Sequence, residues 1–370
     1  MTPDMESLFG GTYAGRRVLV TGHTGFKGSW LVTWLQAMGA QVSALSLSAN
    51  TTPNHYQLLD LSLQERAIDV RNARAVRAAF HEFQPEIVFH LAAQALVRQS
   101  YADPVETFDV NVIGLLNVLE AIRVTPSVRA VVSVTSDKCY RQRNTNTPFT
   151  ESDALGGHDP YSASKACAEI VSESYRASFL STRDGAPVAM ATARAGNVIG
   201  GGDWSSDRLI PDLVRAASTK SVVSIRNPNA VRPWQHVLEP LSGYLALGQR
   251  LLQTTDEDTR CINAWNFGPN SNGHLTVAEV INGFAKHWSD VRSEMDYGSH
   301  PHEAALLFLN CDKAREQLQW LPVWNSDAML ERTANWYRTW YESGAVCTAS
   351  DLNDYVRDAR SAKLAWAAWP

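Results

Sequence analysis

The stretch that decides the fold begins at residue 17 and reads Arg17-Val-Leu-Val-Thr21-Gly22-His-Thr-Gly25-Phe-Lys-Gly28. Its opening run of Val, Leu, Val and Thr is typical of a strand buried on both faces. The residues from Ser29 to Met38 follow with the apolar spacing of a helix. A strand that leads through three glycines into a helix forms a phosphate site, because glycines let the backbone approach a pyrophosphate and the helix N-terminus presents unpaired N–H groups. Three glycines alone can also form an ordinary tight loop.

Strands and helices continue to alternate after this turn. We expect strands at residues 41–47, 86–91, 129–135 and 188–194, with helices at residues 72–83, 107–123 and 161–179. This order predicts an α/β fold with a Rossmann-type, doubly wound parallel sheet, because crossovers between parallel strands need a helix. Glycines and prolines between Gly200 and Pro240 interrupt the alternation and predict a smaller interleaved C-terminal α/β lobe for the substrate.

The expected domain organisation follows from that interruption. A dinucleotide-binding domain is expected at residues 1–193 and about 234–263, and a substrate lobe at about 194–233 and 264–340. Residues 341–370 form a charged tail with a helical pattern, to which the sequence assigns no role.

Composition excludes several classes of protein. The 370 residues are 45% hydrophobic and 19% charged with a net charge of -5, which excludes disorder, collagen-like repetition and a strongly basic nucleic-acid surface. No long uncharged apolar run occurs and the N-terminus is acidic, so we expect a cytoplasmic protein without a membrane span. Five cysteines without a C-x-x-C spacing favour reduced thiols. No metal is expected, since His300 and His302 lack a third ligand.

Tyr161 and Lys165 form the first candidate catalytic pair. The sequence Tyr161-Ser-Ala-Ser-Lys165 lies in the helix expected at 161–179, and residues four apart on a helix share one face. An ammonium beside a phenol lowers the pKa of the phenol, so Tyr161 can act as a base near neutral pH. Such pairs are also common on helix surfaces, but this one follows a dinucleotide turn.

The cofactor is expected to contact the glycines of the turn and the intervening Phe26 and Lys27. A dinucleotide-binding fold usually places Asp or Glu at the end of its second strand to bind the ribose, but Leu45-Ser-Leu-Ser-Ala49 offers no carboxylate. No Arg stands there for a 2′-phosphate either. Asp69, followed by Val70, is a candidate at the end of the third strand, and it can equally be an ordinary turn residue.

Four motifs together resemble the extended short-chain dehydrogenase/reductase family, specifically its nucleotide-sugar enzymes. They are Gly22-x-x-Gly25-x-x-Gly28, Leu91-Ala-Ala-Gln94, Tyr161-x-x-x-Lys165 and Arg194-Ala-Gly-Asn-Val198. The resemblance implies tightly held NAD and an internal redox cycle on a sugar nucleotide. It also implies that Tyr161 is the base at the 4-hydroxyl and that Lys165 binds the nicotinamide ribose. The cofactor cleft would be lined by Leu91, Ala92 and Ala93.

The segment Thr135-Ser136-Asp137-Lys138-Cys139 distinguishes the reactions within that family. Its 4-epimerases carry no acid and base at this point, whereas its 4,6-dehydratases do, usually as Asp-Glu, and Asp137-Lys138 resembles a dehydratase that acts on CDP-glucose. Once carbon 4 is a ketone the carbon-5 proton is acidic, so a neutral Lys138 can remove it while a protonated Asp137 protonates the departing 6-hydroxyl. The resemblance places Ser136 at the 4-oxygen. An ordinary ion pair in a turn is the plain alternative.

Asn197, Arg208 and Arg232 are the candidate substrate residues, because a guanidinium suits a diphosphate. Any single arginine there can instead form a salt bridge within the small lobe. The resemblance implies CDP-glucose as substrate and CDP-4-keto-6-deoxyglucose as product. It also implies a homodimer or homotetramer built on the helices near 107–123 and 161–179. A nucleotide-sugar 4-epimerase and a non-catalytic dinucleotide sensor stay open as alternatives.

Overall fold

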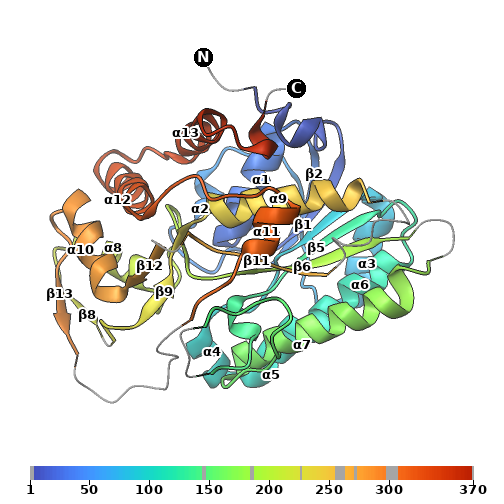
Figure 1. Ribbon diagram of the computed structural model, residues 1–370, viewed down its shortest axis with the longest axis horizontal. Coiled ribbons are helices and arrows are strands. Elements are labelled where there is room, and N and C mark those ends of the chain that lie inside the picture. Colours follow the sequence, from blue (N-terminus) through green and yellow to red (C-terminus); the bar gives the residue numbers. More distant parts are fainter. Residues whose placement is uncertain are drawn as a thin grey trace.

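A seven-stranded parallel sheet forms the centre of the computed structural model (Figure 1). The structure describes residues 4–143, 147–183, 187–225, 227–254, 263–270, 273–296 and 307–368. The strands run in the order β11-β6-β5-β4-β1-β2-β3, so the order reverses between β1 and β4. Their bounds are β1 (Arg17–Thr21), β2 (Gln41–Ser46), β3 (Gln64–Ala67), β4 (Ile87–His90), β5 (Ala130–Val134), β6 (Ala189–Ala195) and β11 (Ala264–Phe267). The Rossmann-type, doubly wound sheet predicted from the sequence is confirmed.

Helices cover both faces of the sheet, because each strand alternates apolar side chains between the faces. Val18 and Val20 of β1 belong to one core and Leu19 to the other. Burying such a side chain contributes about 1.5–3 kcal/mol. The helices of the first core are α1 (Phe26–Ala37), α9 (Leu238–Leu252), α12 (Ser326–Ser343) and α13 (Thr348–Ser361). Those of the second core are α3 (Ala73–Phe83), α6 (Gly114–Arg123) and α7 (Pro160–Tyr175).

The helix expected at residues 107–123 divides into three elements. They are α5 (Pro104–Phe108), the π-helical η2 (Asp109–Ile113) and α6. Within the π turn the buried Asn111 faces α7, where its Nδ2 donates to Ser164 Oγ at 2.8 Å. Ser164 Oγ in turn donates to the carbonyl of Tyr161 at 2.7 Å, so the π turn is tied to the start of α7. Similarly, α7 is continued by the π-helical η4 (Arg176–Leu180).

A smaller lobe lies at one end of the sheet, at the left of Figure 1. Its strands pair as β8 with β13 and β9 with β12, and β7 pairs with β10. The bounds are β7 (Val198–Ile199), β8 (Val223–Ile225), β9 (Val231–Pro233), β10 (Gln235–His236), β12 (His274–Thr276), β13 (Ser293–Met295), α8 (Leu209–Ser218) and α10 (Val277–His287). β11 begins at Ala264, within the range expected for this lobe, and pairs with β6 at the edge of the main sheet. The domain boundaries stay a prediction.

Several short elements connect these layers. They are η1 (Leu8–Gly11), α2 (His55–Leu58), α4 (Val97–Ala102), η3 (Asp137–Cys139), α11 (Asp312–Gln317) and η6 (Ala365–Ala367). No helix in the described ranges combines the length and the apolar character that crossing a membrane requires. Across the same part of the chain, His, Cys, Asp and Glu side chains nowhere gather in threes as a metal site would need. His300 and His302 lie outside the described residues.

Candidate active site

The glycine-rich turn between β1 and α1 has the compact backbone that a pyrophosphate requires. Gly22 has a φ of +80°, and a Cβ there would lie 2.7 Å from the backbone N of Ala92. A Cβ on Gly28 would meet the carbonyl of Gly22. Gly25 is the N-cap of α1, and its carbonyl accepts from Ser29 N–H at 2.9 Å. The turn therefore leaves the N-terminus of a twelve-residue helix open to a ligand, which fits a dinucleotide.

The loop after β4 closes the other side of the turn. The hydroxyl oxygen of Thr21 accepts from the backbone N–H groups of Leu91 and Ala92, each at 3.2 Å. Leu91, Ala92 and Ala93 thus lie where the strand order reverses, which is where open α/β sheets bind ligands. Sequence analysis missed Thr21, because a threonine that ends a strand carries no signal of its own.

Asp69 is engaged by its own neighbour. Its carboxylate accepts from Arg71 at 2.6 and 2.9 Å, and this hydrogen bonding lowers the pKa of Asp69. Val70 is buried, and a Cβ on Gly114 of α6 would meet its side chain. The geometry therefore resembles the ordinary turn that the sequence left as the alternative for Asp69, while a cofactor role stays a prediction.

A carboxylate that sequence analysis missed lies beside the turn. Glu65 of β3 accepts from Tyr56 O–H at 2.7 Å and lies 3.2 Å from His23 Nε2. Burial lowers the pKa of His23, which favours a neutral ring. At the end of β2, the hydroxyls of Ser46 and Thr24 lie 2.7 Å apart. These groups supply polarity next to the strand end that has no carboxylate.

A pocket of about 570 Å³ brings together residues of the main sheet and the smaller lobe. Parallel strands make this possible, since their carboxyl ends meet at one edge of the sheet. Lys165 is buried and does not line this pocket. The predicted site residues among the lining are Phe26, Lys27, Ser136, Asp137, Lys138, Tyr161, Asn197, Arg208 and Arg232.

Asp137 carries a buried carboxyl group at the start of η3. Ser136 Oγ donates to Asp137 Oδ1 at 3.1 Å and accepts from Lys138 N–H at 3.2 Å. The other oxygen, Asp137 Oδ2, is buried without a hydrogen-bond partner among the described side chains and backbone groups. Burial raises the pKa of Asp137, against the opposing effects of Lys138 and the Ser136 hydroxyl. The site thus favours a carboxyl group that holds a proton.

Tyr161 and Lys165 lie one turn apart near the start of α7. Burial raises the pKa of Tyr161 to about 12, and a hydrogen bond between Tyr161 and Ser136 opposes that rise. Burial lowers the pKa of Lys165 to about 8, and its Nζ donates to the carbonyl of Val134 at 3.3 Å. Ser136 and Arg208 both lower the pKa of Tyr161, and the effect expected of Lys165 stays a prediction.

Lys27 lies among the catalytic candidates. Its Nζ is 3.5 Å from Tyr244 Oη and 5.9 Å from the centre of that ring. Burial lowers the pKa of Lys27 to about 8, and the charge of Arg208 acts in the same direction. Lys27 in turn opposes the rise in the pKa of Asp137, so the glycine-rich turn and η3 are electrostatically coupled.

The polar residues of the smaller lobe border the same pocket. Arg208 Nη1 pairs with Asp203 Oδ2 at 2.9 Å, which is the salt bridge that the sequence left open. Arg232 is buried, and its Nη1 donates to the carbonyl of Val231 at 2.9 Å. Asn197 lies beside them and accepts from Gln235 N–H at 3.0 Å through its own carbonyl.

Arg98 and Asp207 form a contact across the pocket lining that no sequence motif indicated. Arg98 belongs to α4, and its Nη1 lies 3.0 Å from Asp207 Oδ1. Both residues line the pocket, and Asp207 has a φ of +58°. The signal was absent because the partners are 109 residues apart and meet only through tertiary structure.

Three features define the class of protein. They are the glycine-rich turn where the strand order reverses, the helix that carries Tyr161 and Lys165, and the pair Asp137 and Lys138. Together they define a dinucleotide-dependent enzyme of the extended short-chain dehydrogenase/reductase class. Residues 19–333 match the sequence model of the family described as GDP-mannose 4,6 dehydratase, and the chain belongs to that family. The resemblance inferred from the four motifs is confirmed.

Individual relatives agree with this assignment. The chain is 45% identical to a CDP-glucose 4,6-dehydratase of Salmonella typhimurium over 93% of its own length and 97% of the relative. It is 25% identical to the dTDP-glucose 4,6-dehydratase 1 of Escherichia coli, over 87% of this chain and 92% of that one. The crystal structure of Thermus thermophilus UDP-glucose 4-epimerase complexed with NAD superposes with a TM-score of 0.75 at 25% identity, covering 87% of this chain and 99% of that one.

Proposed function

We propose that the chain converts CDP-glucose to CDP-4-keto-6-deoxyglucose and water, with NAD as a cofactor that is regenerated in each cycle. The observation that carries this proposal is the buried Asp137 carboxyl, with one unpartnered oxygen, beside Lys138 on the pocket that Tyr161 also lines. The choice of cytidine is supported by the 45% identity to a CDP-glucose 4,6-dehydratase over almost the whole chain.

NAD would be held by the glycine-rich turn and by the loop after β4. Gly22 and Gly28 leave room for the pyrophosphate, and the N–H groups at the start of α1 would donate to it. Lys165 would contact the nicotinamide ribose, as the family resemblance implies. When bound, the nicotinamide supplies a hydride acceptor for carbon 4 and later a hydride donor for carbon 6.

The side chains of the pocket would move the protons. Tyr161 would take the proton of the 4-hydroxyl as a phenolate, which the positive charge of the bound oxidised nicotinamide would favour against the effect of burial. The Ser136 hydroxyl would orient the 4-oxygen. With carbon 4 a ketone, Lys138 would take the carbon-5 proton and Asp137 would give its proton to the 6-oxygen, which departs as water. The raised pKa of Asp137 favours the protonated form that this step requires.

The diphosphate would lie toward the smaller lobe. Arg208 and Arg232 present guanidinium groups to the pocket, and a guanidinium donates paired hydrogen bonds to phosphate oxygens. Asn197 would contact the same part of the substrate. Arg208 would then divide its donors between Asp203 and the phosphate.

A homodimer or homotetramer is part of the proposal. Large apolar side chains are exposed on α4–α7, on the segments between them and on η4, at Tyr101, Val105, Ile113, Val124, Ile170 and Phe179. Pairing these helices between two copies would cover these side chains and remove apolar surface from water. Sedimentation equilibrium tests this, and a monomer at micromolar concentration would overturn it.

Mass spectrometry after incubation with NAD and each of four nucleoside-diphosphate glucoses tests the reaction. We expect a product lighter by one water from CDP-glucose. The structural likeness to UDP-glucose 4-epimerases favours one rival, 4-epimerisation, which would give an isomer of unchanged mass. No product from any of the four would favour the dinucleotide sensor and overturn the proposal.

A further inference from the structure

The chain after α12 packs against the first core, although it lies beyond the residues that match the family model. α13 runs beside α1 at the top of Figure 1. Trp366 of η6 stacks on Phe9 at 5.2 Å and on Tyr355 of α13 at 5.8 Å between ring centres. This segment, residues 344–368, is therefore part of the folded molecule rather than a loose tail.

One continuous chain of buried hydrogen bonds leads from this segment to the glycine-rich turn. Trp336 Nε1 donates to Thr348 Oγ1 at 3.1 Å, and Thr348 Oγ1 lies 2.7 Å from His55 Nε2. His55 Nδ1 lies 2.7 Å from Ser29 Oγ, and Ser29 Oγ donates to the carbonyl of Phe26 at 2.8 Å. Phe26 is the first residue of α1 and stands between Gly25 and Gly28.

The donor and the acceptor of each hydrogen bond in this series follow from the groups at its two ends. The single hydroxyl proton of Ser29 is given to the Phe26 carbonyl, so His55 Nδ1 must carry a proton and donate to Ser29. Burial lowers the pKa of His55 to about 3, so the ring is neutral and its Nε2 is an acceptor. The Thr348 hydroxyl, which itself accepts from Trp336, therefore donates to His55 Nε2.

His55 also supports the pocket loop. Gly202 lies so close to the His55 ring that a Cβ there would overlap it, and Trp30 Nε1 of α1 donates to the carbonyl of Gly201 at 2.9 Å. The same loop continues to Asp203 and Arg208 of the pocket. His55 therefore contacts the phosphate-binding helix, the segment after α12 and the substrate-side loop at once.

We propose that Thr348 and His55 are positioning residues, which hold the start of α1 and the glycine-rich turn in the conformation that binds the cofactor pyrophosphate. The inference rests on the proposed function only in taking that ligand to be NAD. Without the Thr348 hydroxyl, His55 Nε2 and Trp336 Nε1 both lose a partner inside the core. His55 would then no longer be fixed in orientation, and Ser29 would lose a constraint next to the turn.

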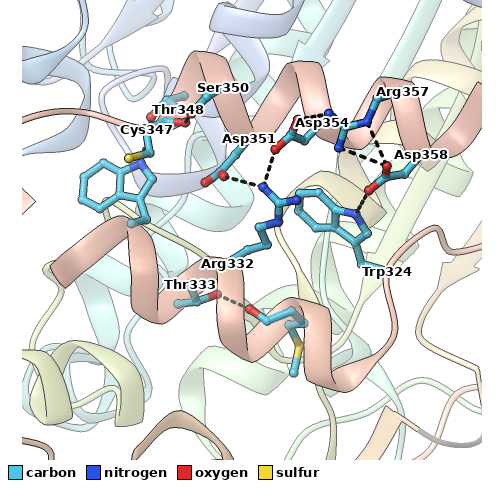
Figure 2. A network of polar contacts seen from close by, with 12 residues as sticks. Trp324, Arg332, Thr333, Cys347, Thr348, Ser350, Asp351, Asp354, Arg357 and Asp358 are labelled. Atoms are coloured by element: carbon cyan, nitrogen blue, oxygen red, sulfur yellow. Dashed lines mark hydrogen bonds and ion pairs between the residues drawn. The ribbon is translucent and has the colours of Figure 1, made fainter. Parts of the chain in front are cut away.

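A second contact between α12 and α13 allows docking of α13 to be tested separately from the hydrogen bonds of Thr348. Figure 2 shows Arg332 of α12 between Asp351 and Asp354 of α13, with Nη1 3.7 Å from Asp351 Oδ1 and paired with Asp354 Oδ2. Ser350 is exposed on the same helix, and its hydroxyl donates to the carbonyl of Cys347 at 2.8 Å. Changes at Arg332 and Ser350 therefore remove neither the Thr348 hydroxyl nor the His55 ring.

Hydrogen–deuterium exchange of the full chain without added cofactor tests the positioning role directly. We expect Thr348→Val to raise the exchange rate of the peptide at residues 22–34 by about tenfold, because a buried hydrogen bond is lost. Thr348→Ser keeps the hydroxyl and should exchange like the wild type, as should the matched control Ser350→Ala. Calorimetric titration with NAD should then give a dissociation constant about tenfold higher for Thr348→Val and unchanged for Thr348→Ser.

Each result separates the possible readings. Equal exchange in Thr348→Val and wild type would overturn the positioning role. An equal increase in exchange for Arg332→Gln would show that docking of α13 in general holds the turn, rather than the hydrogen bonds through His55. That result would also overturn the positioning role. If the wild type binds no NAD, the proposed function fails, whereas the exchange comparison still tests the contact between Thr348 and the turn.

Discussion

At Asp137 the fold keeps a carboxyl group from water and leaves one of its oxygens without a partner. Such a group is costly as a carboxylate, so burial raises its pKa and favours the protonated form. Its neighbour Lys138 is only partly buried on the pocket lining. The two adjacent residues therefore occupy different environments, as the acid and the base of an elimination need.

Lys138→Met is predicted to stop elimination while leaving oxidation of carbon 4 possible. Removing the base should slow formation of the dehydrated product by about 10²–10⁴-fold. Reduced cofactor should accumulate in a single turnover, which absorbance of the reduced nicotinamide measures. Lys286→Met, on the exposed face of α10, is the control and should behave as wild type. Normal turnover of Lys138→Met would show that another group takes the carbon-5 proton.

Tyr161→Phe is predicted to block the earlier step. Without the phenol no group takes the proton of the 4-hydroxyl, so neither reduced cofactor nor product should form at more than about 10⁻² of the wild-type rate. Tyr175→Phe is the matched control, since Tyr175 lies on the same helix and donates to Glu120 at 3.0 Å. Stopped-flow absorbance of the reduced cofactor distinguishes the two variants. Full activity of Tyr161→Phe would show that Tyr161 is not the base.

At the scale of elements, the sequence predicted what local patterns determine. β1, the glycine turn and α1 were expected within a few residues of their observed bounds, because strand burial and helical spacing are written in adjacent residues. The π turn at Asp109–Ile113 was missed, since it depends on where Asn111 meets Ser164 of another helix. The ion pair of Arg98 and Asp207 was missed for the same reason, because it depends on tertiary structure.

α2 contributes a histidine whose burial makes stability depend on pH. Burial lowers the pKa of His55 from 6.5 to about 3, so the unfolded chain binds a proton that the folded chain does not. Its contribution is fully present above pH 6.5 and is lost as pH falls toward 3, by about 1.4 kcal/mol per unit. Between pH 6.5 and 5, we expect the free energy of unfolding to fall by about 2 kcal/mol more for wild type than for His55→Gln, as measured by urea unfolding.

The control for this pH dependence is His81→Gln, because His81 is exposed on α3. The other buried histidines of the described residues, His23, His90 and His236, are unchanged in both variants and cancel in the comparison. Parallel pH profiles of wild type and His55→Gln would contradict a neutral, buried His55.

On the scale of the whole molecule, the pocket residues come from distant parts of the chain. Lys27 follows β1, Asp137 follows β5, and Arg232 belongs to the smaller lobe. The sequence could predict the members that stand at the ends of sheet strands, because a parallel sheet brings those ends to one edge. It could not predict how the lobe or the segment 344–368 packs, because a helical pattern within a segment does not show which distant residues that segment contacts.

That segment is predicted to stabilise the whole fold through Trp366. The ring is 4% exposed and stacks on both Phe9 and Tyr355, so it joins η1 and α13 beside α1. Trp366→Ala should lower the free energy of unfolding by about 3–5 kcal/mol, because it leaves a cavity in the core. Leu321→Ala, at a side chain that is 43% exposed, should change it by less than about 0.5 kcal/mol. Urea unfolding at neutral pH measures both changes. Equal unfolding midpoints for Trp366→Ala and wild type would show that this stack adds nothing to the stability of the core.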